Sequence, residues 1–397
     1  MSNRSELDPV FNPTSIAVIG ASRKPGTIGN KVVENLIEGG YKGKIFPVNP
    51  SADEILGQKA YPKVTDIPGE VDAAVFCVPA KFVLDAARDC AAKKVKGLII
   101  ISSGFSETGN RKDEEELLRI AKTGGCRIIG PNIVGILSNT TKANASFAPC
   151  LPFPGHTAFI TQSGALLIAI DMLTFVRRVG MSAMISNGNM SDVNFADAIE
   201  YYAKDPDTKN ITLYIEGLKD GRRFIEAGRK ANKPIVAIKS GVSARGAAAA
   251  ASHTGSLAGA AKVYDAAFRQ AHVVPAYNLD ELMDRTQALA TQPPLKGGNI
   301  LVITNGGGIG VLATDAAEKH GVPLSAAPAD LQAELRKCMP DFGSAKNPVD
   351  ITGGAGLEGY EMAIECALKH DWVDGLAVLC CETAVTDPVA IAKGTIL

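Results

Sequence analysis

Three times along this 397-residue chain, a short apolar segment runs directly into a glycine-containing turn and then into a helical pattern. The three junctions are SIAVIGASRKPGTIGN (15–30), HTAFITQSGALLIAIDML (156–173) and NILVITNGGGIGVLATDAAEKHG (299–321). Strand, tight turn and helix in this order form the repeating unit of parallel sheets, which are covered by helices on both faces. The sequence therefore predicts an α/β protein made of doubly wound domains.

Two stretches rich in proline and small residues, SFAPCLPFPGHT (146–157) and TQPPLKGG (291–298), separate the three blocks. We expect domains at residues 1–145, 146–292 and 293–397. The last of these has few strands for a doubly wound domain, because only TAVTDPVAIAKGTIL follows its strand GLAVLCCE. We therefore expect the third domain to be truncated.

The composition excludes several classes of protein. A formal net charge of −1 provides no basic field that would attract nucleic acid or an anionic membrane. No apolar run is long enough to span a bilayer, and the polar N-terminal segment MSNRSELDPVFNPTS lacks the apolar core of a signal peptide. The eight cysteines form no CxxC pair and have no zinc-ligand spacing to a histidine, so we expect reduced packing residues and no metal site. These features favour a cytoplasmic protein.

The first glycine turn has the features of a phosphate site. Gly20, Gly26 and Gly29 follow a strand and precede a helix, so backbone amides and the helix dipole could hold a phosphate. A tight turn without a ligand has the same pattern. A dinucleotide-binding domain places an acid about 20 residues later to bind a ribose, but here the next strand ends in VNP (48–50). This favours another phosphate-bearing ligand, such as coenzyme A.

Two further turns, SSGFSE (102–107) and GPNIVG (130–135), follow strands of the same block. The carboxyl ends of parallel strands meet at one edge of a sheet, and open α/β sheets bind ligands there. Either turn alone would be an ordinary turn and would not indicate a binding site. Together with the first glycine turn, they could line one crevice.

The second block carries two polar residues at strand ends. Ser163 and Gly164 stand where a helix begins, so the hydroxyl and the backbone amides could form an anion site, or Ser163 could be a plain helix cap. Glu216 ends the apolar strand of TLYIEGLKD. A carboxylate there is usually solvated, but it could also accept a hydrogen bond from an imidazole and fix its tautomer.

The segment ASHTGSLAG (251–259) places His253, one of five histidines, among residues with little side-chain bulk. The simplest interpretation is a surface loop with an incidental histidine. The alternative is a catalytic imidazole on a loop that reorients at little cost, because its small residues supply little packing energy. A helix expected at GAAKVYDAAFRQA (259–271) could stabilise an anion near the ring. A neutral imidazole can accept a phosphoryl group and store it as phosphohistidine.

Taken together, these segments resemble a known family. GASRKPGTIGN, VNP, SSGFSE, GPNIVG, TQSGAL, LYIEGLKD and SHTGSLAG occur in the order found in the α subunit of the NDP-forming acyl-CoA synthetases. The resemblance covers essentially the whole chain, and its most specific element is SHTGSLAG combined with an upstream IEG. Within the family, the chain is most similar to the ADP-forming acetyl-CoA synthetases and more distantly to succinyl-CoA synthetase.

The resemblance implies a Rossmann-like CoA-binding domain, a flavodoxin-like domain with a phosphohistidine loop, and a second flavodoxin-like domain of the ligase-CoA type. It implies that His253 is phosphorylated and that Glu216 orients its imidazole. The implied phosphate site contains Ser163, Gly164 and Gly255. The implied CoA-binding residues are Gly20, Ala21, Ser22, Lys24 and Gly26 near the phosphates, Val48, Asn49 and Pro50 near the adenine, and Val78, Pro79, Ser102, Ser103, Gly104, Pro131 and Asn132 toward the thiol.

The implied reaction converts acyl-CoA, ADP and phosphate into a carboxylate, CoA and ATP through an acyl phosphate and a phosphohistidine. No ATP-grasp domain is recognisable in the sequence. ADP/ATP and Mg²⁺ are therefore expected to bind mainly to an ATP-grasp β subunit or fused domain. We also expect an oligomer, and we expect neither nucleic acid nor a membrane as a partner.

Two other functions fit parts of the sequence. An acyl-CoA-binding regulatory platform, such as the synthetase-like part of some protein lysine acetyltransferases, tends to lose the phosphorylatable histidine, whereas His253 and Glu216 are both present here. An NAD-dependent dehydrogenase could use the first domain, but Asn49 stands where the ribose-binding acid is expected. Both features favour the ligase.

Overall fold

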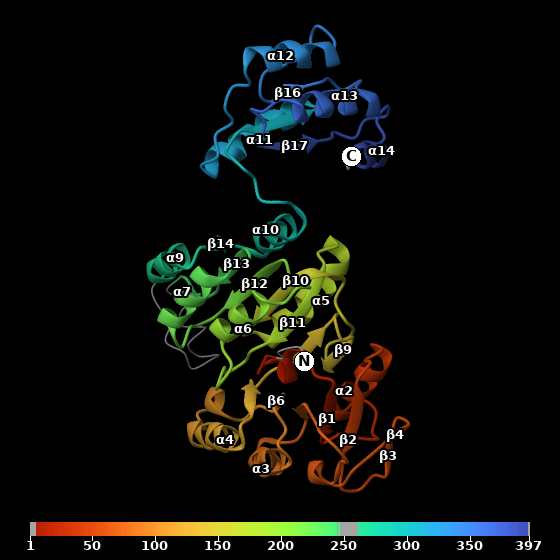
Figure 1. The fold of residues 1–397 in the computed structure, drawn as a ribbon, viewed down its shortest axis with the longest axis vertical. Coiled ribbons are helices and arrows are strands. Elements are labelled where there is room, and N and C mark those ends of the chain that lie inside the picture. Colours follow the sequence, from red (N-terminus) through yellow and green to blue (C-terminus); the bar gives the residue numbers. More distant parts are fainter. Residues whose placement is uncertain (1–4, 244, 247–260, 396–397) are drawn as a thin grey trace. The chain divides into compact units, whose positions relative to one another are not determined.

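The computed structural model describes residues 5–243, 245–246 and 261–395. The chain divides into two compact units, Met1–Gln292 and Pro293–Leu397 (Figure 1). The first unit contains two large sheets and the second contains one small sheet. All three are mainly or wholly parallel, so the α/β class expected from the three strand–turn–helix junctions is confirmed.

The first sheet has five strands in the order β2-β1-β5-β6-β7, all parallel where they pair. Parallel neighbours need a crossover connection, which helices supply here. A short hairpin, β3 (Glu54–Ile55) with β4 (Gln58–Lys59), follows β2. The strands are β1 (Ser15–Ile19), β2 (Lys44–Val48), β5 (Ala73–Phe76), β6 (Gly97–Ile100) and β7 (Arg127–Ile129), and the helices are α1 (Asp8–Phe11), α2 (Ile28–Glu38), α3 (Val83–Lys93) and α4 (Arg111–Gly124), with 3-10 turns at Val64–Asp66, Ala80–Phe82 and Ser106–Thr108.

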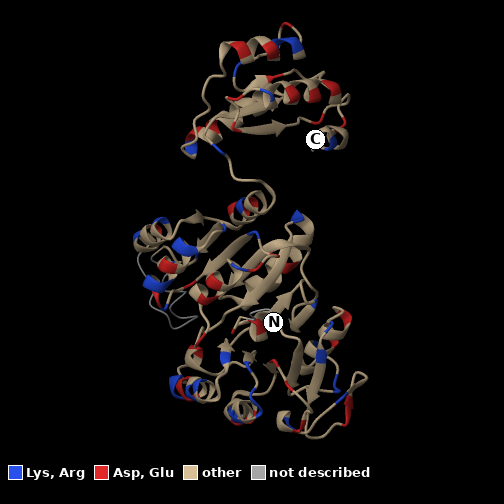
Figure 2. Cartoon of the chain, viewed as in Figure 1, with Lys and Arg blue, Asp and Glu red and all other residues tan. Residues whose placement is uncertain are grey.

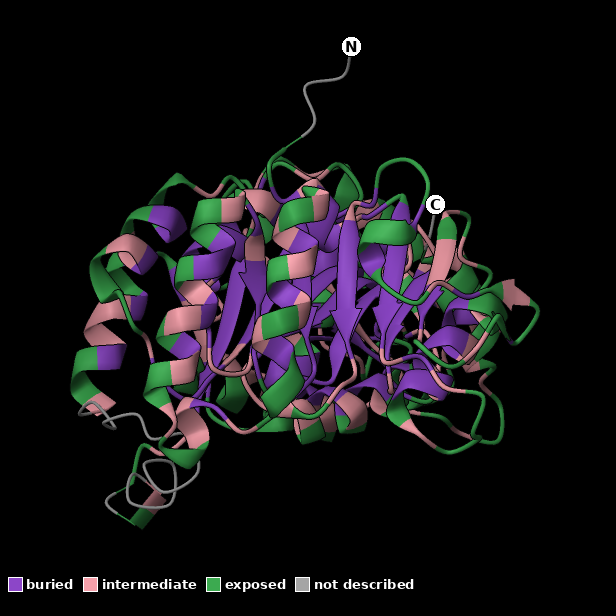
Figure 3. Ribbon diagram, turned by 90° about the horizontal axis from the view of Figure 1, so that it is seen from below, coloured by how far each residue is buried: buried purple, intermediate pink, exposed green. Residues whose placement is uncertain are grey.

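Alternate residues of β1 enter two different cores. Ile16 and Val18 pack in the cluster that contains Val33 of α2. Ala17 and Ile19 pack in the cluster that contains α3 and α4. Because successive side chains of a strand point to opposite faces, helices bury both faces of this sheet. Figure 3 shows the result, with buried strands between helices that have one buried side and one exposed side.

The second sheet has seven strands in the order β14-β13-β12-β10-β11-β8-β9. The first five are parallel, while β8 pairs antiparallel with β11 and β9 pairs antiparallel with β8. The strands are β8 (Gly135–Ser138), β9 (Ala143–Ser146), β10 (Pro154–Thr161), β11 (Met181–Ser186), β12 (Asn210–Ile215), β13 (Ile235–Lys239) and β14 (Val273–Ala276). The helices are α5 (Gly164–Arg177), α6 (Phe195–Tyr202), α7 (Gly221–Lys230), α9 (Ala261–Gln270) and α10 (Leu279–Thr291).

The hairpin β8–β9 shows why the first two blocks form one unit. It lies at residues 135–146, next to the domain boundary expected after residue 145, yet it hydrogen-bonds to the second sheet. One continuous core cluster contains Val18 of the first sheet together with Ile160 and Leu213 of the second. The two sheets therefore share apolar contacts.

The second unit is built around the three-stranded parallel sheet β16-β15-β17. The hydroxyl of Tyr360 accepts a hydrogen bond from the Asn305 backbone (3.0 Å) and donates one to the Leu379 carbonyl (2.8 Å). It thereby joins the ends of two neighbouring strands. The elements are β15 (Ile300–Thr304), α11 (Gly307–Lys319), α12 (Ala329–Leu335), a 3-10 turn at Arg336–Cys338, β16 (Val349–Asp350), α13 (Leu357–Leu368), β17 (Gly375–Leu379) and α14 (Pro388–Gly394).

Charged side chains lie mainly on helices and loops, and the strands are nearly free of them (Figure 2). In the part of the chain that the structure describes, no helix combines the length and apolar character needed to cross a membrane. All eight cysteines are free thiols.

One carboxyl group on a helix is fully buried. Asp171 of α5 is fully buried, and its Oδ2 lies 3.7 Å from the Sγ of Cys150. Burial raises the pKa of Asp171 to about 6, above its value of about 3.9 in an unfolded chain. The folded state therefore holds this proton more tightly. The contribution of the protonated Asp171 carboxyl to the stability of the fold is fully present below about pH 4 and is lost as the pH rises through 6.

We accordingly predict that Asp171→Asn stabilises the protein at pH 7.5 by about 1–3 kcal/mol, because the amide removes the buried charge. The gain should shrink toward zero near pH 4, where the wild-type carboxyl is already protonated. Thermal unfolding across this pH range measures the effect, with the exposed Asp53→Asn as the control. A gain that does not change with pH would contradict the assignment.

Candidate active site

The turns that follow the strands of the first sheet lie along one edge in the order of the strands. Gly20 donates its N–H to the Val48 carbonyl (3.0 Å), and the Asn49 side chain donates to the Ala21 carbonyl (2.8 Å). The turns after β1 and β2 are therefore joined. Farther along, the Ser102 hydroxyl donates to the Val78 carbonyl (2.5 Å). The structure thus brings together at one edge the segments that the sequence predicts to bind CoA.

The first turn can exist only with glycine at its closest contact. A Cβ on Gly29 would lie 2.0 Å from the carbonyl oxygen of Gly20, and Gly20 itself has φ +83°. The turn is therefore packed tightly against the start of α2. Lys24, whose N–H is bound to the Ser22 hydroxyl (3.0 Å), and the nearby Arg23 are exposed. Backbone amides at a helix N-terminus with exposed cations beside them fit the phosphates of CoA.

Asn132 continues the same edge toward the second sheet. Its N–H donates to the Ser102 carbonyl (3.0 Å), and it has φ +63°. Across from it, a Cβ on Gly188 would lie 2.5 Å from the Asn132 carbonyl oxygen and 2.7 Å from Cγ2 of Ile133. The loop after β11 therefore leaves no room for a side chain at position 188 beside Asn132.

At this junction the structure has a cavity of about 870 Å³, lined by loops and helices that connect the strands of the two sheets. Four of the residues singled out from sequence line it together: Asn132, Ser163, Gly164 and Glu216. The other predicted CoA residues lie along the edge already described and do not line this cavity. His253 and Gly255 lie outside the described residues, so their positions relative to the cavity stay predictions.

Ser163 begins α5 at the cavity wall. Its hydroxyl accepts a hydrogen bond from the Leu166 backbone (3.3 Å), and its own N–H donates to the Thr161 hydroxyl (3.0 Å). Ser163 is therefore a helix cap, as one of the two sequence interpretations proposed. The other interpretation, an anion site, is compatible with this geometry because α5 directs its N-terminal amides toward the cavity.

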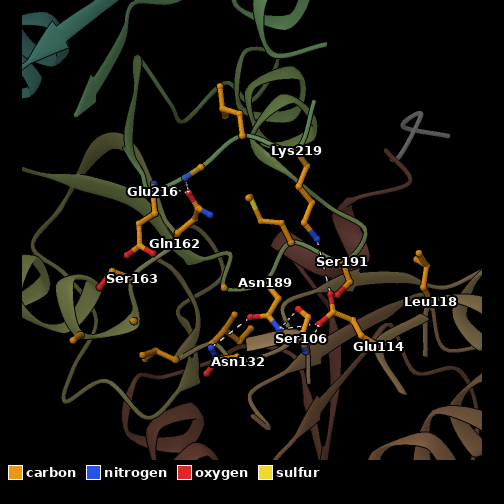
Figure 4. Close-up of a pocket in the computed structure, with 18 of the residues that line it drawn as sticks. Ser106, Glu114, Leu118, Asn132, Gln162, Ser163, Asn189, Ser191, Glu216 and Lys219 are labelled. Atoms are coloured by element: carbon orange, nitrogen blue, oxygen red, sulfur yellow. Dashed lines mark hydrogen bonds and ion pairs between the residues drawn. The ribbon is translucent and has the colours of Figure 1, made fainter. Parts of the chain in front are cut away.

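Glu216 is held at the cavity by its neighbours. The side-chain oxygen of Gln162 accepts hydrogen bonds from the N–H groups of Glu216 (2.6 Å) and Gly217 (2.9 Å). Glu216 is 7% exposed, so it is not the solvated edge residue that one interpretation allowed. Figure 4 shows Glu216, Gln162 and Ser163 grouped on one side of the cavity.

A buried cation stands near Glu216. Lys239 ends β13, pairs in register with Ile215, and is 8% exposed. Its ammonium lies 4.7 Å from the ring centre of Tyr264 and donates to the Ser240 carbonyl. Burial lowers the pKa of Lys239, and the Glu216 carboxylate offsets part of that change. The Lys239 ammonium and the Glu216 carboxylate therefore attract each other.

The opposite side of the cavity carries a polar network that the sequence did not reveal. The Asn189 side-chain nitrogen donates to Ser106 (3.1 Å), Glu107 (2.6 Å) and Glu114 (2.9 Å), and its oxygen lies 3.5 Å from the Asn132 nitrogen (Figure 4). Burial by itself raises the pKa of Glu114, but hydrogen bonds from Ser106 and Asn189 hold it below its usual value. Glu114 is therefore an ionised carboxylate facing the cavity.

An ion-pair network fastens the two sheets beside this cavity. Arg127 of β7 lies 2.8 Å from Asp192 and 3.3 Å from Asp197, and Arg223 lies 2.8 Å from the same Asp197. Asp197 is 4% exposed, so the two arginines offset the cost of burying its carboxylate. Among the described residues, no group of three or more His, Cys, Asp or Glu side chains could hold a metal ion.

Three family models match the chain: a CoA binding domain at residues 14–139, a succinyl-CoA ligase like flavodoxin domain at 154–289, and a ligase-CoA domain at 300–396. Relatives of known function match over nearly the whole chain. The α subunit of acetate–CoA ligase (ADP-forming) I from Pyrococcus furiosus is 50% identical over 98% of this chain and 85% of its own length. The acetate–CoA ligase (ADP-forming) of Methanocaldococcus jannaschii is 42% identical over 89% of this chain, which spans 50% of that protein.

A solved structure agrees with these matches. The Ca. Korarchaeum cryptofilum dinucleotide forming acetyl-coenzyme A synthetase 1, in complex with phosphate and ADP, superposes with a TM-score of 0.95 at 45% identity, covering 98% of this chain and 85% of that one. The sequence matches and the structural superposition thus indicate the same family as the motifs that line the cavity. The chain belongs to the family of ADP-forming acetate–CoA ligases.

Proposed function

We propose that this chain is the CoA-binding part of an ADP-forming acyl-CoA synthetase, which converts acyl-CoA, ADP and phosphate into a carboxylate, CoA and ATP. One observation carries the proposal. Asn132, expected near the CoA thiol, and Ser163 and Gly164, expected to bind phosphate, line the same cavity as Glu216. A thioester and a phosphate bound there would lie side by side, which is the geometry that a transfer between them needs.

In the proposed first step, a phosphate oxygen attacks the thioester carbonyl carbon. The carbon–sulfur bond breaks, CoA leaves as the thiolate and takes up a proton, and an acyl phosphate remains. The N-terminal amides of α5 and the Ser163 hydroxyl hold the phosphate, because a helix N-terminus stabilises negative charge. The loops that bear Asn132 and Gly188 hold the thioester end.

In the second step, a ring nitrogen of His253 attacks the phosphorus, and the bond from phosphorus to the acyl oxygen breaks to release the carboxylate. Glu216 accepts a hydrogen bond from the other ring nitrogen and stabilises the positive charge that develops on the ring. The Lys239 ammonium interacts electrostatically with the Glu216 carboxylate from the neighbouring strand.

The phosphoryl group then passes to ADP. We propose that ADP/ATP and Mg²⁺ bind on an ATP-grasp β subunit, as the designation "subunit alpha" of the Pyrococcus relative suggests, or on a fused domain, since the Methanocaldococcus relative is about twice as long as the match. Such a complex would be an oligomer of the cytoplasm. We further propose the division into a CoA-binding domain (1–145), a phosphohistidine-loop domain (146–292) and a ligase-CoA domain (293–397).

Calorimetry and single-turnover thioester cleavage test this function. In calorimetry, the chain should bind CoA but not NAD. In the single-turnover assay, with more protein than acetyl-CoA, the thiol of CoA should be released only when phosphate is present. With an ATP-grasp subunit and ADP added, one ATP should form per CoA. Binding of CoA without phosphate-dependent cleavage of any acyl-CoA would contradict the proposal and favour a regulatory acyl-CoA platform.

A further inference from the structure

The cavity has an apolar wall between its two proposed reactive ends. Resting on the function proposed above, we infer that Phe147 and Ile168, together with the supporting Val134, form the acyl subsite and set the size of the acyl group. All three residues line the cavity. Their role as a selectivity filter follows from where the reaction has to occur.

The reacting carbon is bonded to the thiol sulfur in the substrate and to a phosphate oxygen in the product. It must therefore lie between the thiol end, at Asn132, and the phosphate end, at Ser163 and Gly164. The rest of the acyl group extends from this carbon. The side chains that surround the space between the thiol end and the phosphate end therefore decide which acyl groups fit.

The backbone from Asn132, at the thiol end, reaches the phosphate end within two residues. Asn132 is followed by Ile133 and Val134, and a Cβ on Gly164 would lie 2.7 Å from Cγ2 of Val134. Val134 therefore touches the start of α5. Glycine at position 164 is what permits this contact, and any larger residue there would push the phosphate turn away from the wall.

Phe147 and Ile168 flank Val134. The N–H of Phe147 donates to the Val134 carbonyl (3.3 Å), which holds the two residues side by side. Ile168 follows Gly164 by four residues on α5, so it lies on the same face of the helix as the turn. Phe147, Val134 and Ile168 all pack in the core cluster on this face of the second sheet.

The three residues differ in burial. Val134 is 3% exposed and serves mainly as support. Phe147 and Ile168 are half-buried and contribute their remaining surface to the cavity. Truncating either of them should enlarge the subsite with limited damage to the core.

The charges around the cavity favour an acyl group without a second carboxylate. Glu216 and Glu114 both face the cavity and are 7% and 8% exposed, whereas the cations Arg111 and Lys219 are solvent-exposed. The Lys219 ammonium already lies 3.9 Å from Glu114. A carboxylate at the far end of an acyl chain would meet apolar side chains and like charge, which is unfavourable without a paired cation.

The test measures kcat/KM of the chain with its ATP-grasp subunit for acetyl-, butyryl-, hexanoyl-, phenylacetyl- and succinyl-CoA. Wild type should prefer the smaller apolar groups and use succinyl-CoA poorly. Phe147→Ala and Ile168→Ala should each raise the hexanoyl-to-acetyl ratio at least about tenfold, the effect of one to a few methylenes in a fitted pocket. Leu118→Ala is the matched control, because Leu118 lines the cavity on the Glu114 side, away from Ser163 (Figure 4). It should change the ratio less than about twofold.

Phe147→Leu and Ile168→Val repeat the test if an alanine variant fails to fold, with a smaller shift in the same direction. Unchanged ratios in folded variants that still turn over acetyl-CoA would overturn this inference and leave the proposed function intact. Wild-type preference for succinyl-CoA would also overturn it. Failure of wild type with every acyl-CoA would instead refute the proposed function itself.

Discussion

Glu216→Gln should lower kcat by about 100- to 1,000-fold, the usual cost of removing one preorganised electrostatic group from a reaction centre. The substitution keeps the shape of the side chain and removes its charge. The backbone N–H of Glu216 keeps its hydrogen bond to Gln162, so the loop should stay in place. An amide can still accept a hydrogen bond from an imidazole, but it cannot stabilise an imidazolium charge to the same extent. Steady-state ATP formation from acetyl-CoA, phosphate and ADP measures the loss.

Glu115→Gln is the matched control for this result. Glu115 also lines the cavity, but it is exposed on α4 and belongs to the opposite wall. Its substitution should change kcat by less than about twofold, as expected for an exposed charge. Thermal unfolding of both variants should match wild type within a few degrees. If the two substitutions lowered kcat equally, the proposed catalytic role of Glu216 would be contradicted.

Gly29→Ala should weaken CoA binding by at least about tenfold and destabilise the protein by about 1–3 kcal/mol, the cost of overpacking a tight contact. The added Cβ would lie 2.0 Å from the carbonyl oxygen of Gly20, which is backbone and cannot rotate away. The start of α2 must then move from the end of β1. That movement displaces the amides that we expect to bind the CoA phosphates. Calorimetric titration with CoA measures the affinity directly.

Gly221→Ala provides the comparison. Gly221 begins α7, and nothing lies within 4 Å of the Cβ it would gain. Alanine there should leave CoA affinity unchanged and be neutral or slightly stabilising, because alanine favours a helix over glycine. Unaltered CoA affinity in a folded Gly29→Ala variant would show that the first turn does not bind the phosphates.

The architecture could be predicted from the sequence because its signals are local. Each strand–glycine–helix junction specifies a parallel βα unit by itself, and the strand order then places the turns after β1, β5 and β6 along one edge. The hairpin β8–β9 could not be assigned to the second sheet in the same way. Strand β11, which pairs with β8, begins more than 40 residues after β8 ends, and nothing in residues 135–146 specifies that pairing.

The candidate site was predictable only in part. Ser163 and Glu216 stand at strand ends, where ligands of α/β sheets bind, although their joint role came from the family resemblance. Asn189 carried the same signal, since the turn NGNM follows the strand MSAMIS, but it was missed. Glu114 could not be found, because it lies in the charge run KDEEE, which is typical of a solvated helix face. It is buried in the folded chain, where its carboxylate accepts hydrogen bonds from Asn189 and Ser106.

We propose that this chain stores a phosphoryl group on His253, which receives it at the cavity that contains Ser163 and Glu216. The most direct measurement incubates the protein with acetyl-CoA and ³²P-phosphate, without nucleotide, and maps the label by mass spectrometry under alkaline conditions that preserve phosphohistidine. We expect close to one phosphoryl group per chain on His253. The label should depend on acetyl-CoA and should pass to ADP once an ATP-grasp subunit is added. A chain that cleaves acetyl-CoA in the presence of phosphate yet carries its label on another residue, or carries none, would contradict this proposal.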